Sequence, residues 1–149
     1  MEYLSKNSTE TAEIAANFAK VLITKPGFGN QAMIFGLYGE LGSGKTTFMK
    51  YLAENFGVKE TIQSPTFVIE KIYNITNNEI FKKLIHIDAY RIENDQEMIN
   101  LGWNEIIADP KNLICLEWPE KISKIMPAHI KIFFEHGDNE NERKIKIEL

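Results

Sequence analysis

Apolar residues recur at helical spacing in some segments of this chain and form short strand-like runs in others. Residues 8–24 place four apolar side chains on one helical face, namely Ile14, Phe18, Val21 and Leu22. Asn7 and Glu10 form the pattern of a capping box at the start of this segment. We therefore predict a helix over about residues 8–24 that packs on a sheet.

A short apolar run over residues 33–38 predicts a buried strand. A second helical pattern follows it and ends at Gly57, and its apolar face consists of Phe48, Met49, Leu52 and Phe56. Further along, Asp95 is placed to cap a short helix that stops at Gly102 and carries Met98, Ile99 and Leu101.

The other strand-like runs are residues 67–73, 84–88, 113–117, 129–134 and 144–149. The Asn77-Asn78 pair supplies a turn, so we expect the first run to pair in a hairpin with a strand that returns through residues 80–87. The last two runs alternate apolar and charged residues, which predicts two antiparallel strands with one face in water.

The chain has 149 residues, of which 44% are hydrophobic and 26% are charged, as in one globular domain. We predict an α/β protein, a single domain over residues 1–149, with a mixed β-sheet flanked by helices and an antiparallel C-terminal portion. The N-terminus lacks the apolar core of a signal peptide, and no apolar run reaches membrane-spanning length. We expect a cytoplasmic protein without membrane contact.

A match to the phosphate-loop pattern G-x-x-x-x-G-K-[ST] lies between the strand at residues 33–38 and the helix after it. It consists of Gly39, Glu40, Leu41, Gly42, Ser43, Gly44, Lys45 and Thr46, with Thr47 directly after it. Its glycines let backbone N–H groups surround an anion, Lys45 supplies charge for the β- and γ-phosphates, and the Thr46 hydroxyl can bind Mg²⁺. The strand-loop-helix context argues against a simple linking turn. We predict a P-loop NTPase fold.

Two of the apolar strands end in a carboxylate, Asp88 in one case and Glu117 in the other. In open α/β sheets the ligand binds beyond the carboxyl ends of the strands. Each acid alone is also compatible with an exposed strand end that has no function. Because both follow buried strands in a phosphate-loop protein, we predict that at least one of them serves a magnesium ion.

The net charge of −4, with Arg91 and Arg143 as the only arginines, disfavours independent binding to nucleic acid. It also weakens the case for a small-molecule kinase, which needs further cationic groups over the transferred phosphoryl group. Cys115 lies in an apolar run and is expected to be a buried small hydrophobe. The histidines are scattered and predict no zinc cluster.

Five blocks of the sequence together resemble the TsaE (YjeE) family, and the resemblance covers about residues 5–149. They are residues 39–47, Ser64-Pro65-Thr66-Phe67, His86 to Arg91, Leu101-Gly102 with Glu105, and Leu116 to Glu120. The phosphate loop is generic, whereas the Ser-Pro-Thr-Phe, Asp-x-Tyr-Arg and Glu-Trp-Pro combination is specific. Ala89 and Trp103-Asn104 depart from the family pattern but touch no expected phosphate or metal ligand.

The resemblance implies an ATPase of tRNA threonylcarbamoyladenosine (t6A) synthesis, with ATP and Mg²⁺ as cofactors. Such a protein works with the TsaB–TsaD heterodimer, which carries out the transfer, and supports its repeated turnover. It is expected to hydrolyse ATP slowly when alone and to meet tRNA only indirectly, through the complex.

The resemblance also implies roles for individual residues. Residues 39–46 would wrap the phosphates, with Thr46 and Glu117 as Mg²⁺ ligands and Asp88 near the metal or the attacking water. Thr66 would sense the γ-phosphate. The adenine contacts are suggested to be Ser8, Thr11 and Arg143, and Trp118 is expected to be a packing or partner-facing aromatic residue.

Two other functions remain open from the sequence. One is a nucleoside or small-molecule kinase, in which Asp88 would be the general base and Arg91 would bind the acceptor. The other is a nucleotide-gated binding module with little turnover, in which Thr66 and its neighbours reorder with ATP and expose a partner surface.

Overall fold

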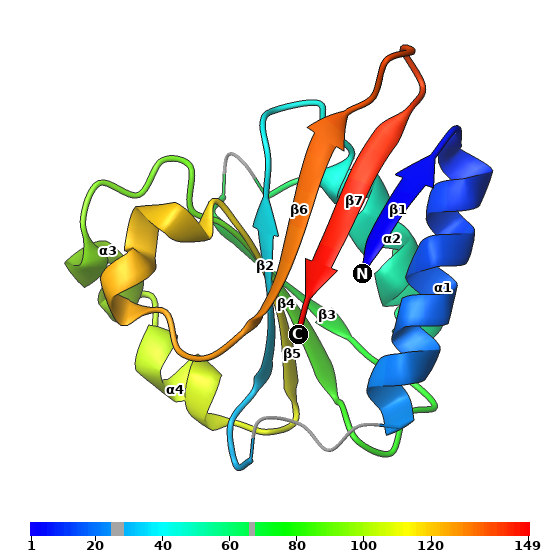
Figure 1. Cartoon of the computed structure of the whole chain (residues 1–149). Helices are drawn as coiled ribbons and strands as arrows, with labels where there is room; N and C mark the ends of the chain where they lie inside the picture. Colours follow the sequence, from blue (N-terminus) through cyan, green and yellow to red (C-terminus); the bar gives the residue numbers. More distant parts are fainter. Residues whose placement is uncertain (25–28, 66–67) are drawn as a thin grey trace.

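The computed structural model describes residues 1–24, 29–65 and 68–149, and seven strands in this part of the chain form one mixed sheet. They are β1 (Glu2–Ser5), β2 (Met33–Tyr38), β3 (Glu70–Asn74), β4 (Lys83–Asp88), β5 (Asn112–Glu117), β6 (Ile130–His136) and β7 (Arg143–Glu148). Their order is β1-β7-β6-β2-β5-β4-β3 (Figure 1). The central pairs β6–β2, β2–β5 and β5–β4 are parallel, and the outer pairs are antiparallel. The predicted fold class is confirmed.

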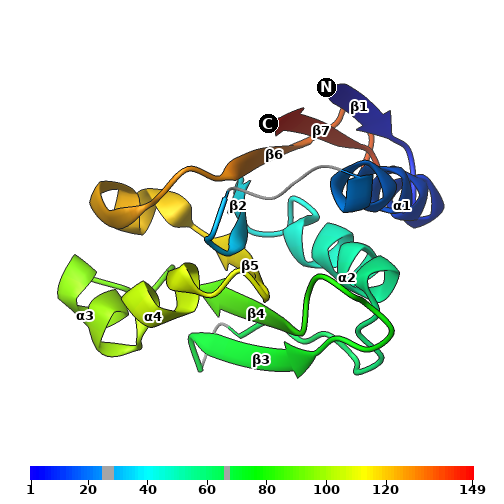
Figure 2. The same ribbon diagram turned by 90° about the horizontal axis from the view of Figure 1, so that it is seen from below.

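Helices cover both faces of the sheet (Figure 2). Helices α1 (Ser8–Thr24) and α2 (Lys45–Phe56) lie on one face, and the short helices α3 (Asp95–Asn100) and α4 (Trp103–Ala108) lie on the other with the 3₁₀ segment η1 (Pro119–Ile125). Strand residues alternate between the two faces, so that Phe35 of β2 packs under α1 and α2 while Ile34 packs with α4 and η1. None of the described helices combines the length and apolarity needed to cross a bilayer.

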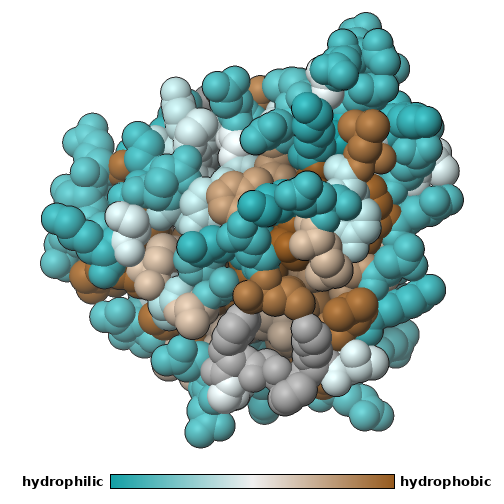
Figure 3. Space-filling model, in the orientation of Figure 1, coloured by the Kyte–Doolittle hydropathy of each residue, from teal (hydrophilic) through white to brown (hydrophobic). Residues whose placement is uncertain are grey.

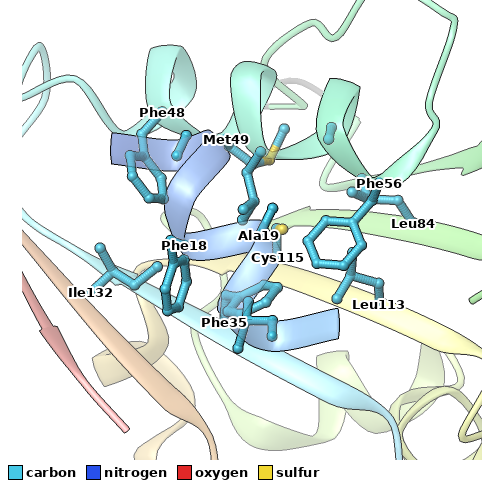
Figure 4. Packing of buried hydrophobic residues seen from close by; sticks show 14 of the residues in the cluster. Phe18, Ala19, Phe35, Phe48, Met49, Phe56, Leu84, Leu113, Cys115 and Ile132 are labelled. Carbon is cyan, nitrogen blue, oxygen red and sulfur yellow. The ribbon is translucent and has the colours of Figure 1, made fainter. Parts of the chain in front are cut away.

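Aromatic side chains hold α1 and α2 against the sheet (Figure 4). The Phe18 ring of α1 lies 5.9 Å from that of Phe35 and 6.5 Å from that of Phe48. Cys115 of β5 is fully buried in the same cluster, as expected. This packing fixes the start of α2, and therefore the loop before it, relative to the ends of β4 and β5.

Helix α1 has the predicted bounds but a partly different buried face. Phe18 and Leu22 are buried, whereas Val21 is 39% exposed, so its assignment to the apolar face was wrong. The helix turns Ala15 and Ala19 inward instead, and these small side chains let it approach α2 closely. At its start, Asn7 Oδ1 accepts from Glu10 N at 2.9 Å, while the Glu10 carboxylate accepts from Lys6 N at 2.7 Å.

Several boundaries differ from those predicted. Strand β1 was not predicted, and the short helix α4 was also missed. Val68 and Ile69 form a turn back to Pro65 O, with Ile69 at a φ of 67°, so β3 begins only at Glu70. Residue 67, the predicted start of this strand, lies outside the described residues. The cap of α3 is Asn94, whose side chain accepts from Glu97 N at 3.1 Å, and not Asp95.

The tail forms the antiparallel pair β6–β7, as predicted. Its lysines, Lys131, Lys144 and Lys146, are exposed. Charged and polar side chains cover most of the surface seen in Figure 3, with small apolar areas between them.

Gly57 ends α2, as predicted, with a φ of 101°. A Cβ atom at this position would lie 2.2 Å from the carbonyl oxygen of Thr76, which itself belongs to a chain segment hydrogen-bonded to Gly57 O. We predict that Gly57→Ala lowers the free energy of unfolding by at least about 2 kcal/mol, because left-handed strain and a backbone clash add together. Urea denaturation measures this change.

Gly29→Ala is the matched control for Gly57→Ala. Gly29 has a φ of 66°, but apart from its chain neighbours no atom of the described residues lies within 4 Å of the position that a Cβ would take. It carries the conformational strain without the clash, so its effect should be smaller. Equal losses of stability in the two variants would contradict the clash at Thr76.

Candidate functional site

The loop between β2 and α2 curls back over the end of the sheet. Its glycines Gly39, Gly42 and Gly44 all have positive φ, at 145°, 74° and 99°, as the phosphate-loop pattern predicts. A Cβ on Gly39 would lie 2.6 Å from Phe134 O and 2.9 Å from Ser43 Oγ, so the loop passes too close to β6 for a side chain there. The result is a tight loop that leads directly into the N-terminus of α2, where the free backbone N–H groups favour an anion.

Lys45 begins α2 and is only 5% exposed. Its ammonium group donates to the carbonyl oxygen of Gly39 and lies 4.3 Å from the centre of the Trp118 ring. Burial lowers the pKa of Lys45, and the negative charges of Glu117 and Asp88 are the largest effects that raise it again. The positive charge thus lies beside two carboxylates and a π-face inside the protein.

The two strand-end carboxylates are neighbours. Asp88 of β4 and Glu117 of β5 are directly paired in the parallel register, and they are 6% and 4% exposed. Asp88 Oδ1 accepts from Tyr90 N at 2.9 Å, and Glu117 Oε2 is 3.0 Å from Nε2 of His86. The sequence predicted both acids at strand ends, and the sheet order places them side by side below the loop.

A pocket of about 490 Å³ opens at this end of the sheet. The predicted site residues that line it are Ser8, Thr11, Leu41, Gly42, Gly44, Lys45, Thr46, Thr47, Asp88, Glu117 and Arg143. Gly39, Glu40 and Ser43 belong to the same loop but do not line the pocket. Thr66 lies outside the described residues. Arg91, the residue considered for a kinase acceptor, is exposed and not part of the lining.

The first turn of α1 and the start of β7 form one wall of the pocket. Thr11 Oγ1 is buried and lies 2.6 Å from Ser5 Oγ, whereas Ser8 is exposed. Arg143 Nη1 donates to the carbonyl oxygens of Glu140 and Glu142, and its side chain passes about 3.5 Å from where a Cβ of Gly44 would lie. These three residues come together although α1 and β7 lie at opposite ends of the chain, because β1 pairs with β7.

Other lining residues were not assigned to the site from the sequence. They are Asn7, Ser64, Trp118, Phe134, Asn141 and Ile145. Trp118, expected to be a packing or partner-facing residue, follows Glu117 with a φ of 59° and packs against Tyr90 with ring centres 5.2 Å apart. A non-glycine residue in this conformation is unusual. The position of Trp118 between a strand-end acid and Pro119 is the sequence signal that could have assigned it to the site.

The polar groups of the site suit a polyanion with a divalent cation. The Ser43 hydroxyl is 1% exposed and has no hydrogen-bond partner among the described residues. Among the described residues, the Lys45 ammonium group contacts only the Gly39 carbonyl oxygen and the Trp118 ring. Phosphate oxygens would satisfy the Lys45 ammonium group, which lines the pocket, and the nearby carboxylates provide the hard oxygen ligands that Mg²⁺ prefers.

Comparisons with known proteins assign this chain to a family. The family model described as "Threonylcarbamoyl adenosine biosynthesis protein TsaE" matches residues 5–145. A tRNA threonylcarbamoyladenosine biosynthesis protein TsaE from Rickettsia typhi is 37% identical over 140 residues, which span 93% of this chain and 88% of the relative. The protein of the same name from Borreliella burgdorferi is 39% identical over 94 residues, which span 63% of this chain and 65% of the relative.

A solved structure shares the fold as well. The crystal structure of Bacillus subtilis YdiB superposes with a TM-score of 0.71 at 28% identity, and the match covers 97% of this chain and 82% of that chain. The sequence and the fold thus agree with the family resemblance. The chain belongs to the TsaE family of threonylcarbamoyl adenosine biosynthesis proteins.

Proposed function

We propose that residues 1–149 act as a single P-loop ATPase domain, which binds ATP with Mg²⁺ and hydrolyses it in support of t6A modification of tRNA. One observation carries this proposal: a buried phosphate-loop lysine and two strand-end carboxylates line one pocket. A phosphate loop alone would support binding. The acids beside it support metal-dependent hydrolysis.

The phosphates would lie in the loop of residues 39–46, where backbone N–H groups and the Lys45 ammonium take up negative charge. Lys45 donates to Gly39 O, so a bound phosphate oxygen would replace a neutral acceptor with a charged one. Charge-assisted hydrogen bonds of this kind are roughly twice as strong as neutral ones.

The residues that would hold Mg²⁺ are Thr46, Glu117 and Asp88. Mg²⁺ prefers six oxygen ligands and commonly uses one or two carboxylates together with waters and substrate phosphates. Thr46 is half-buried at the start of α2 and lines the same pocket as both acids. When bound, the metal supplies charge neutralisation on the β- and γ-phosphates.

The catalytic work of the chain's own groups would be divided between the loop and the strand ends. Lys45 and the loop amides would stabilise charge that develops on the γ-phosphoryl group. Asp88 would orient the attacking water, since its carboxylate lies beside Glu117 on the pocket side of the sheet. Thr66 is proposed to sense the γ-phosphate.

The nucleoside would lie against the wall formed by α1 and β7. Ser8, Thr11 and Arg143 are the proposed adenine-side contacts, and all three line the pocket. The Thr11 hydroxyl already bonds to Ser5, so its contribution would be to shape the wall, whereas Ser8 and Arg143 offer donors.

The proposed partner is the TsaB–TsaD heterodimer, which would carry out the threonylcarbamoyl transfer, with tRNA met only through that complex. The names of the relatives place those proteins in tRNA threonylcarbamoyladenosine biosynthesis. Hydrolysis is expected to be slow in the isolated chain, since a partner arginine could complete the site. We propose a cytoplasmic location.

The function is tested by reconstitution with TsaB–TsaD, tRNA, ATP and the threonylcarbamoyl donor. We expect t6A to exceed one equivalent per complex only when this chain and hydrolysable ATP are both present. A non-hydrolysable ATP analogue should stop modification after about one round. Repeated turnover without this chain, or with the analogue, would contradict the proposal.

A further inference from the structure

A buried histidine lies directly behind the proposed metal ligand. His86 of β4 is 0% exposed, and it precedes Asp88 by two residues, so both side chains project from the same face of the strand. Its register partner on β5 is Cys115, and Glu117 follows two residues later on that strand. The three polar side chains His86, Asp88 and Glu117 therefore share one face at the carboxyl ends of β4 and β5.

The His86 ring makes one polar contact with the described residues. Its Nε2 lies 3.0 Å from Glu117 Oε2. Because a carboxylate only accepts hydrogen bonds, the hydrogen of this bond must be on Nε2. Nδ1 is buried and has no hydrogen-bond partner among the described residues.

This arrangement is costly for a side chain that serves only to fill space. A ring nitrogen buried without a partner destabilises the fold, and Cys115 opposite it shows that an apolar side chain fits this layer of the core. The contact to Glu117 is what distinguishes histidine from an apolar residue here. Glu117 lines the pocket while His86 does not, so the bond reaches the carboxylate from the protein side.

We propose that His86 is a positioning residue, which donates to Glu117 Oε2 and thereby holds the carboxylate in the orientation that binds Mg²⁺. The inference rests on the proposed role of Glu117 as a metal ligand. Hydrogen bonds from outside the ligand set commonly fix ligating carboxylates, and their loss typically weakens metal binding 10- to 100-fold.

The test measures Mn²⁺ affinity by electron paramagnetic resonance in the presence of saturating ADP, together with ADP affinity in EDTA. His86→Met removes the donor at similar volume, whereas His86→Gln retains an N–H donor. We expect Mn²⁺ to bind about 10- to 100-fold more weakly to His86→Met, and His86→Gln to recover part of this loss. ADP affinity in EDTA should be unchanged in both variants.

Cys115→Ala is the matched control, because Cys115 is equally buried in register with His86 but makes no hydrogen bond to Glu117. It should bind Mn²⁺ like the wild type. Equal losses in Cys115→Ala and His86→Met, or a loss of metal-free ADP affinity in His86→Met, would show a merely structural role and overturn the inference.

Glu117→Ala in the same assay separates the two proposals. If Glu117→Ala weakens Mn²⁺ binding and His86→Met does not, the positioning role fails and the metal site stands. If Glu117→Ala leaves Mn²⁺ affinity unchanged, both fail. If His86→Met does not fold, ¹⁵N NMR of the wild-type His86 ring decides the question, and the His86→Gln spectrum assigns the ring signals. A ring that carries a proton on Nε2 supports the inference. A neutral ring that is protonated only on Nδ1 overturns it.

Discussion

Lys45→Ala is expected to abolish detectable binding of Mg-ATP, with affinity at least about 100-fold below that of the wild type. Lys45 is the buried cation of the pocket, and its ammonium group is held by one carbonyl oxygen and the Trp118 ring. Removing it takes away a positive charge beside Asp88 and Glu117, so the negative charges of these two acids would repel a triphosphate more strongly. Isothermal titration calorimetry measures the change.

Lys50→Ala provides the control, since Lys50 lies on the same helix but is exposed and does not line the pocket. The affinity of Lys50→Ala for Mg-ATP should stay close to that of the wild type, because surface charges are screened by salt. Binding of Mg-ATP to folded Lys45→Ala with wild-type affinity would contradict the placement of the phosphates.

Glu117→Ala is expected to lower Mg²⁺-dependent ATP hydrolysis at least about 100-fold, while binding of ATP in EDTA is retained. The carboxylate is 4% exposed, lines the pocket and lies in register with Asp88. Its loss would remove a proposed metal ligand but leave the phosphate loop and Lys45 intact. Steady-state phosphate release at several Mg²⁺ concentrations, with the partner proteins present, measures the effect.

Glu120→Ala is the companion to Glu117→Ala. Glu120 is an exposed acid three residues further along the chain, and it does not line the pocket although its charge reaches Lys45. The Glu120→Ala variant should retain most of the Mg²⁺-dependent ATP hydrolysis. Hydrolysis by Glu117→Ala at the wild-type rate would reject the role assigned to Glu117.

The parts of the site that a local pattern encodes were predictable. The spacing of Gly39, Gly44 and Lys45 requires positive φ at the glycines and a helix directly after them, and the structure has both. Asp88 and Glu117 each end an apolar run, so their place at strand ends could be inferred. Whether these two acids pair directly depends on the order of the strands in the sheet. Right-handed crossovers between parallel strands favour this order, but no local sequence pattern specifies it.

Long-range contacts were not predictable from the sequence. The wall that joins Asn7 and Asn141 exists because β1 pairs with β7, and β1 has only four residues with a weak alternating pattern. The bond between His86 and Glu117 joins positions 31 residues apart and depends on the register of β4 and β5. A shift of one residue would turn one of these side chains to the opposite face.

The predictions of the short elements were wrong for a different reason. In the region after β4, Asn94 and Asp95 are both good capping residues, and the hydrogen bond to Glu97 N alone decides between them. Val68 and Ile69 have strand-forming side chains, yet their backbone N–H groups bond to Pro65 O in a turn. Here local hydrogen bonding overrode β propensity, which is a weak guide outside the sheet core.

The proposed function requires that the loop of residues 39–46 binds a triphosphate whose metal is shared with acids from β4 and β5. Calorimetric titration of the folded wild-type chain with ATP, in Mg²⁺ and in EDTA, is the test of this requirement. We expect saturable one-to-one binding that is tighter with Mg²⁺. In Glu117→Ala, the affinity with Mg²⁺ should fall to the affinity measured in EDTA. No saturable heat with ATP in either condition, with TsaB–TsaD present or absent, would contradict it.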